Sequence, residues 1–164
     1  MRGFERTTEG ALEAELLAEE LGVLSSMNSQ LIRLLSTGAA PDDPAMQRLL
    51  PDAYPDDAGE SAEFRRYTEA GLLARKLENA ATMAQTLEVA AGGASRRGAA
   101  RLRLDPEQTQ AWLRALTDIR LVLATRLGIT AEDERPAPDD AAAAMYDVYD
   151  WLGFVQESLV QALG

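Results

Sequence analysis

The 164-residue sequence contains no cysteine and no histidine. Without cysteine there is no disulfide, no thiol nucleophile, no zinc-thiolate site and no thiol redox switch. Histidine is the commonest metal ligand and the usual general base near neutral pH, so its absence excludes Ser-His-Asp triads and histidine-containing zinc or di-iron sites. We therefore expect no enzyme and no cofactor. A carboxylate- or Mg²⁺-dependent enzyme is the least favoured alternative.

Long apolar segments are also missing. The N-terminus lacks the apolar segment of a signal peptide, and no stretch reaches the length of a membrane span. We therefore expect a cytoplasmic protein that does not bind membranes.

Positive charge is scarce, because 27 acidic residues stand against 16 basic ones and the net charge is −11. A strongly acidic protein is repelled by nucleic-acid phosphates unless its basic residues cluster. We therefore expect DNA to be contacted only through or together with a protein partner.

Apolar residues make up 46% of the chain, which is enough for a core in a chain of this length. Their spacing is mainly that of helices, which predicts a mainly α fold: a bundle of four to six helices in a single domain, 1–164. Residues 92–99 and 130–138 are predicted to be flexible loops. The expected helices cover about residues 9–36, 44–50, 57–91, 106–127 and 140–163.

Local signals set the helix ends. Asp43-Pro44, Asp105-Pro106 and Asp139 predict capped helix starts, and Gly128 predicts a helix end. We interpret the paired aspartates at 42–43, 56–57 and 139–140 as caps rather than Mg²⁺ ligands.

The helix predicted over about 57–91 has a start signal in Asp57 and Glu60, which form a capping box. Phe64 and Tyr67 are expected to face inward. A second start at Thr68 would allow a bend, and a helix-turn-helix is an alternative that we favour less.

One strand is also predicted. Residues 101–104 alternate between arginine and leucine, which is typical of a strand. Residues 2–6 are a candidate partner, so we expect a short two-stranded ribbon near 2–6 and 100–104.

Two groups of residues are candidates for partner binding. The first is a basic cluster, Arg96, Arg97, Arg101 and Arg103, which could contact a phosphate backbone or an acidic partner. A solvated loop and strand edge is the simpler interpretation.

The second group consists of the aromatic residues of the last predicted helix. They are Tyr146, Tyr149, Trp151 and Phe154. A helix that is apolar over so much of its surface is either central in a bundle or part of an interface. This helix is the best candidate for a protein partner or for a homodimer.

Several stretches together form a recognisable pattern. They are LLPDAY (49–54), FRRYTE (64–69), RKLENA (75–80), LDPEQTQAWLRAL (104–116), DIRL (118–121), TRLG (125–128) and YDWLGFVQESL (149–159). With them the chain resembles, over nearly its whole length, an actinobacterial family carried as a domain of unknown function, whose members are named oxidative-stress transcriptional regulator AosR.

The resemblance implies a cytosolic, non-enzymatic regulator that acts by protein–protein contact with a redox-responsive sigma factor or RNA polymerase. An adaptor or scaffold role linked to Clp proteolysis or sulfur metabolism is the alternative that it implies. This chain departs from a thiol sensor because it has no cysteine. Any signal must therefore enter through a partner, a ligand or the abundance of the protein.

Overall fold

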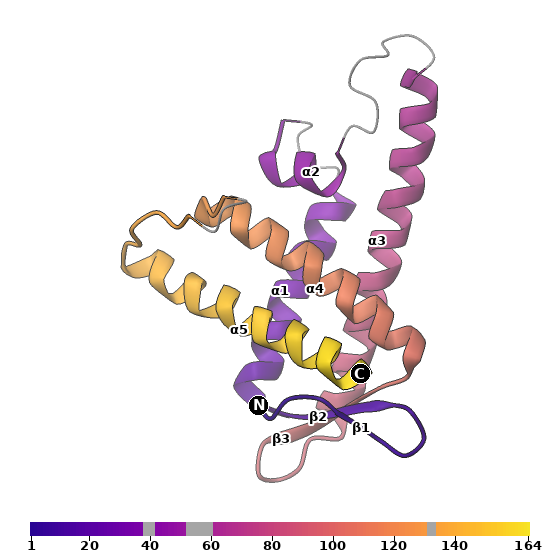
Figure 1. The fold of residues 1–164 in the computed structure, drawn as a ribbon, viewed down its shortest axis with the longest axis vertical. Helices are drawn as coiled ribbons and strands as arrows, with labels where there is room; N and C mark the ends of the chain where they lie inside the picture. Colours follow the sequence, from indigo (N-terminus) through magenta and orange to yellow (C-terminus); the bar gives the residue numbers. More distant parts are fainter. Residues whose placement is uncertain (38–41, 52–60, 131–133) are drawn as a thin grey trace.

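The computed structural model describes residues 1–37, 42–51, 61–130 and 134–164, except for the side chains of 61–65. Figure 1 shows helices forming most of the molecule, with a small sheet at one end, so the mainly α prediction is confirmed. The elements are β1 (Glu5–Arg6), β2 (Leu12–Leu17), α1 (Ala18–Ser36), α2 (Pro44–Leu49), α3 (Ser61–Gly92), β3 (Ala99–Leu104), α4 (Pro106–Leu127) and α5 (Asp140–Leu163).

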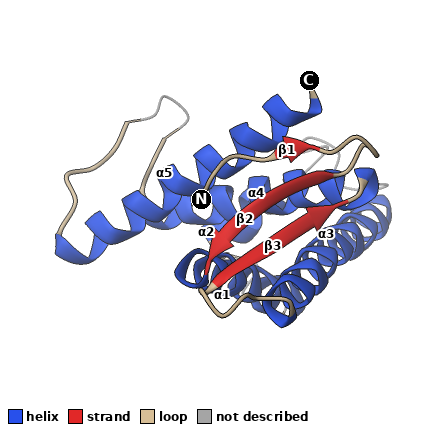
Figure 2. Cartoon of the chain, turned by 90° about the horizontal axis from the view of Figure 1, so that it is seen from below, coloured by secondary structure: helices blue, strands red, loops and turns tan. Residues whose placement is uncertain are grey.

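The sheet has three antiparallel strands in the order β1-β2-β3. Leu12 is paired with Leu104, and Leu17 with Ala99. We predicted that the N-terminal segment pairs with residues 100–104. This prediction is wrong, because β2 lies between β1 and β3. Figure 2 shows one face of this sheet turned outward and the helices lying behind the other face.

Strand β2 replaces the first part of the helix that the sequence predicted from about residue 9. Leu12, Ala14 and Leu16 are buried and alternate with more exposed neighbours. Leu12 and Leu16 are four residues apart, so their spacing fits a helix face as well as a strand face. Gly10, with φ +88°, forms a turn before β2, and α1 begins only at Ala18.

The helix ends predicted at Asp43, Asp105, Asp139 and Gly128 are confirmed by their caps. Asp43 accepts a hydrogen bond from the Ala45 N–H at the start of α2, and Asp139 accepts one from Ala142 at the start of α5. Asp105 and Gln108 form the capping box of α4. Gly128 ends α4 with φ +71°, a conformation that glycine adopts without strain.

Helix α3 runs without a break through residues 68–71, so no helix-turn-helix forms there. Tyr67 is 82% exposed, and the prediction that it faces inward is wrong. Figure 1 shows the reason, because the N-terminal part of α3 extends beyond α4. The predicted start at Asp57 and the side chain of Phe64 lie outside the described residues.

Helix α4 lies at the centre of the fold, where it contacts α1, α2, α3, α5 and β3. Its Trp112 is fully buried and donates a hydrogen bond from Nε1 to Thr86 Oγ1 at 2.8 Å. The ring of Phe4 meets Trp112 edge-on, with 6.3 Å between the ring centroids. The sheet and the helices thus share one core around Trp112.

Candidate interaction surfaces

The four aromatic side chains of α5 do not share one environment. Tyr146 and Tyr149 are buried, with 8% and 9% exposure, whereas Phe154 is 47% exposed and Trp151 is half-buried. The Tyr146 hydroxyl donates toward the carbonyl oxygens of Pro136 (3.0 Å) and Leu127 (3.3 Å). Only Phe154 and part of Trp151 therefore remain available for a partner.

Phe154 lies among acidic residues. Helical spacing places Asp147, Asp150 and Glu157 on the same side of α5, and all three are exposed. Arg135 forms a bidentate ion pair with Asp150, at 2.7 and 3.0 Å, which holds the pKa of that carboxyl below its usual range. We call this surface the α5 outer face; it consists of Asp147, Asp150, Trp151, Phe154, Glu157 and Gln161.

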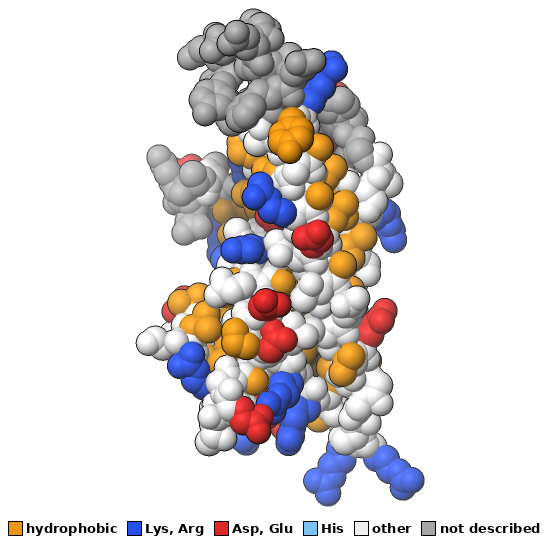
Figure 3. Space-filling model, turned by 90° about the vertical axis from the view of Figure 1, so that its right-hand side faces the viewer, with side chains coloured by type: hydrophobic (Ala, Val, Ile, Leu, Met, Phe, Trp, Pro, Cys, Tyr) orange, Lys and Arg blue, Asp and Glu red, His pale blue; other side chains and the backbone are white. Residues whose placement is uncertain are grey.

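The predicted basic cluster lies at the sheet end of the molecule. Arg96 and Arg97 are exposed in the turn before β3, and Arg101 and Arg103 are exposed on β3. Arg103 pairs with Glu13 on β2 at 2.8 Å and also with Glu9. The four arginines thus lie at the same end of the molecule, but acidic neighbours offset the charge of Arg103, and Figure 3 shows red and blue side chains close together at this end.

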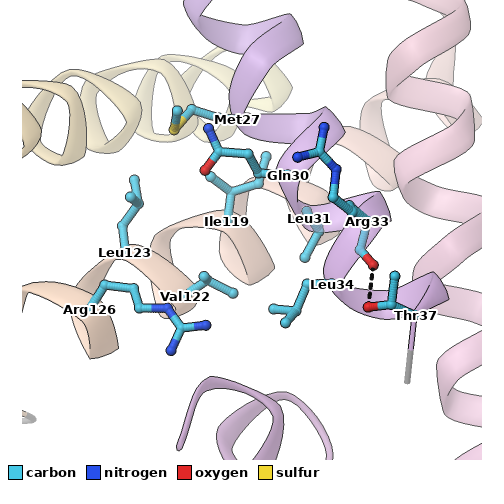
Figure 4. A pocket seen from close by; sticks show the side chains of 10 residues that line it. All are labelled: Met27, Gln30, Leu31, Arg33, Leu34, Thr37, Ile119, Val122, Leu123 and Arg126. Atoms are coloured by element: carbon cyan, nitrogen blue, oxygen red, sulfur yellow. Dashed lines mark hydrogen bonds between the residues drawn. The ribbon is translucent and has the colours of Figure 1, made fainter. Parts of the chain in front are cut away.

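An apolar pocket of about 330 Å³ lies between α1 and α4. Leu31, Ile119 and Leu123 are its buried residues, and Figure 4 shows side chains of the two helices facing each other across it. Arg126 at the rim is bound to Asp43 by two hydrogen bonds of 2.9 and 3.0 Å. The pocket can hold an apolar side chain or small molecule. The sequence did not reveal it, because it depends on how two helices far apart in the chain lie against each other.

A buried ion pair joins α3 to α4. Lys76 Nζ lies 2.7 Å from Asp118 Oδ1, and the two side chains are 16% and 6% exposed. Burial raises the pKa of Asp118 above its ordinary value of 3.8, and Lys76 opposes this rise. Paired acid–base catalysis by carboxylates would need a second carboxylate opposite Asp118. The group opposite Asp118 is instead the cation of Lys76.

Among the side chains that the structure describes (residues 1–37, 42–51, 66–130 and 134–164), no three acidic groups are close enough to share a metal ion. No helix in these segments is both long and apolar enough to cross a bilayer.

Arg48 and Arg120, which the sequence did not mark as site residues, line another depression beside Tyr149. A signal for Arg120 was present, since it is the one charged residue within the apolar stretch 119–124. Such a residue in the buried part of a helix needs a polar partner or a function.

Comparison with known proteins gives a consistent result. The family described as a domain of unknown function (DUF2017) matches residues 1–163. The putative oxidative stress regulator AosR of Mycobacterium leprae is 32% identical over 94% of this chain and 78% of its own length. The oxidative stress regulator AosR of Mycobacterium tuberculosis (strain H37Rv) is 31% identical with the same coverage. No solved structure matches the chain significantly.

Proposed function

The chain belongs to the DUF2017 family, and we propose that it is a cytoplasmic, non-enzymatic regulator of the oxidative-stress response. The names of its mycobacterial relatives support a regulatory role. Because the sequence has no cysteine, the protein does not sense oxidants through a thiol of its own. The stress signal reaches it through a partner, a ligand or a change in its abundance.

The regulator acts by protein–protein contact through the α5 outer face. The observation that carries this proposal is the exposure of Phe154, 47%, between the acidic residues Asp150 and Glu157. An aromatic anchor is a common centre of protein interfaces, and flanking carboxylates favour a basic partner surface. A sigma factor or RNA polymerase, which carries basic surfaces for nucleic acid, is the partner that we propose.

DNA is contacted only when such a partner holds the regulator in place. A net charge of −11 opposes binding to a phosphate backbone. The arginines at the sheet end, Arg96, Arg97 and Arg101, are exposed and would be the contacts to DNA or to an acidic partner in the assembly. Self-association through the α5 outer face remains a prediction.

The experiment measures binding of the purified chain to RNA polymerase loaded in turn with each sigma factor of the source organism. Phe154→Ala should weaken binding at least about tenfold, the loss expected for a buried interface anchor. Val89→Ala is the matched control, since Val89 is 77% exposed on α3 and lies outside the α5 outer face. Its affinity should equal that of the unchanged chain.

Two results would contradict the proposal. One is tight, sequence-specific DNA binding by the isolated chain. The other is a pull-down, with and without peroxide, that recovers the Clp machinery and no polymerase component, which would support an adaptor role in proteolysis.

A further inference from the structure

The side chain of Arg120 is held by several contacts, although no described acidic residue forms an ion pair with it. Its guanidinium carbon lies 4.6 Å from the ring centroid of Tyr149, and its Nη1 donates to Gln156 Oε1 at 3.2 Å. A Cβ on Gly153 would lie only 3.2 Å from Nη2, so glycine at this position leaves room for the guanidinium. Three residues of α5 thus hold this one side chain of α4.

The charge of Arg120 is incompletely compensated. Among the described residues, no carboxylate lies within ion-pair distance of it, and its buried Nε has no hydrogen-bond partner. Asp150 is close enough to feel the charge of Arg120, but its carboxylate is bound to Arg135. An unpaired buried donor on a cation is costly, so the missing hydrogen bond of Nε calls for an explanation, and a bound ligand is one.

Arg120 also lines an open depression of about 520 Å³ on the surface of α4, between α2 and α5. Arg48 of α2 lines the same depression and makes no ion pair with any described residue. Among the described residues the lining contains no carboxylate, although acidic residues outnumber basic ones in this protein. Two guanidinium groups therefore line one concave site in which no described residue supplies a balancing negative charge.

The rest of the lining adds hydroxyl and apolar groups. Tyr149 and Thr130 carry hydroxyls, and Leu121, Ala124 and Ile129 form apolar walls. Guanidinium groups bind carboxylates and phosphates through paired hydrogen bonds, and apolar walls favour a ligand with a hydrophobic body.

We propose that the depression between Arg48, Arg120 and Tyr149 is a binding site for a small organic anion, a carboxylate or phosphate ester that carries an apolar group. The anion accepts hydrogen bonds from the two guanidinium groups, and its apolar group contacts Leu121 and Ile129. This site lies apart from Phe154, so the proposal does not depend on the proposed function.

The test uses the full chain and two probes, benzoate and phenyl phosphate, which distinguish a carboxylate from a phosphate ester. Calorimetric titration should show saturable 1:1 binding of at least one probe, with a Kd below about 1 mM, and no heat with neutral benzamide. Chemical shifts should move for the amides of Thr130 and Tyr149. Inorganic phosphate should bind at least about tenfold more weakly than phenyl phosphate, since it lacks an apolar group.

Variants assign the binding to this depression. Arg48→Gln and Arg120→Gln should each weaken the probe at least about tenfold. Arg48 is exposed, so its variant keeps the test valid even if Arg120→Gln fails to fold. Arg96→Gln, an exposed arginine at the sheet end, is the matched control and should bind as the unchanged chain does. The absence of saturable binding, or equal affinity of Arg48→Gln and Arg96→Gln, would overturn the proposal.

Discussion

The guanidinium of Arg120 and Gly153 are fitted to each other, because a Cβ at Gly153 would lie 3.2 Å from Arg120 Nη2 and 3.4 Å from its Cζ. Glycine within a helix normally costs about 1 kcal/mol relative to alanine. At position 153 glycine is favoured despite this cost, because a larger residue would crowd the Arg120 guanidinium.

A comparison of two glycine substitutions tests this fit. Gly22→Ala in α1, where an added Cβ meets nothing within 4 Å, should raise the free energy of unfolding by up to about 1 kcal/mol. The free energy of unfolding of Gly153→Ala should be at least about 1 kcal/mol lower than that of Gly22→Ala, because the added Cβ forces Arg120 to move. Urea unfolding measures both values. Equal stabilisation by the two substitutions would show that Arg120 is not held in this position.

The ion pair between Lys76 and Asp118 predicts a strong asymmetry between single and double substitutions. Lys76→Met should lower the free energy of unfolding by about 3 kcal/mol, because it leaves the buried Asp118 without its cation. Lys76→Met with Asp118→Leu should recover most of that loss. Arg75→Met, at an exposed neighbouring position, should change stability by less than about 0.5 kcal/mol. A double variant as unstable as Lys76→Met would contradict this account.

The same aspartate predicts an unusual pH dependence. Since burial raises the pKa of Asp118 in the folded protein above 3.8, the folded state binds this proton more tightly than the unfolded state does. Ionisation of Asp118 therefore lowers stability as the pH rises from about 3.8 through its raised folded-state pKa. The stability of the unchanged chain relative to Asp118→Asn should decrease over this range. Denaturant unfolding of both proteins between pH 4 and 7 measures the difference, and an increase with pH would refute the assignment.

The pKa values of Asp43 and Asp150 are lowered, chiefly by hydrogen bonds from Arg126 and Arg135, so their effect has the opposite sign. Their stabilising contribution is present above about pH 3.8 and is lost as the pH falls through their lowered pKa values. The contribution of Asp118 to the pH dependence of stability is therefore measured by comparing the unchanged chain with Asp118→Asn, in which Asp43 and Asp150 are the same.

The hydrogen bond from Trp112 to Thr86 predicts that removal of the Thr86 hydroxyl destabilises the core. Thr86→Val keeps the shape of the side chain but leaves the buried indole N–H without its acceptor, which should cost about 1–3 kcal/mol. Thr125→Val is the control, because the Thr125 hydroxyl donates only to Leu121 O within the same helix. It should cost less than about 0.5 kcal/mol in thermal unfolding. Similar losses at both positions would mean that the indole finds another acceptor.

The sequence predicted the helices whose ends are determined by neighbouring residues. Asp105 with Gln108, and Gly128, act within one or two turns of helix, so their meaning does not depend on the rest of the fold. Strand β2 was missed for the opposite reason. The four-residue spacing of Leu12 and Leu16 fits both structures, and the choice is made by pairing with β3.

The candidate sites were predicted less well than the helices. Aromatic residues on α5 could be recognised, but the sequence could not separate the buried Tyr149 from the exposed Phe154, because that depends on where α4 lies. The depression at Arg48 and Arg120 combines α2, α4 and α5, and no local pattern connects those segments. The burial of the α5 aromatic residues and the lack of a described acidic partner for Arg48 and Arg120 depend on how the helices pack, which the sequence does not give.

The pairing of β2 with β3 has a consequence for synthesis on the ribosome. Strand β2 emerges early, but its partner Ala99–Leu104 is translated only after α1, α2 and α3. At elongation rates of about 5–20 residues per second this delay is on the order of ten seconds. During it Leu12 and Leu16 have no strand to pair with, so the nascent chain presents an apolar segment to chaperones until the middle of the protein has left the exit tunnel.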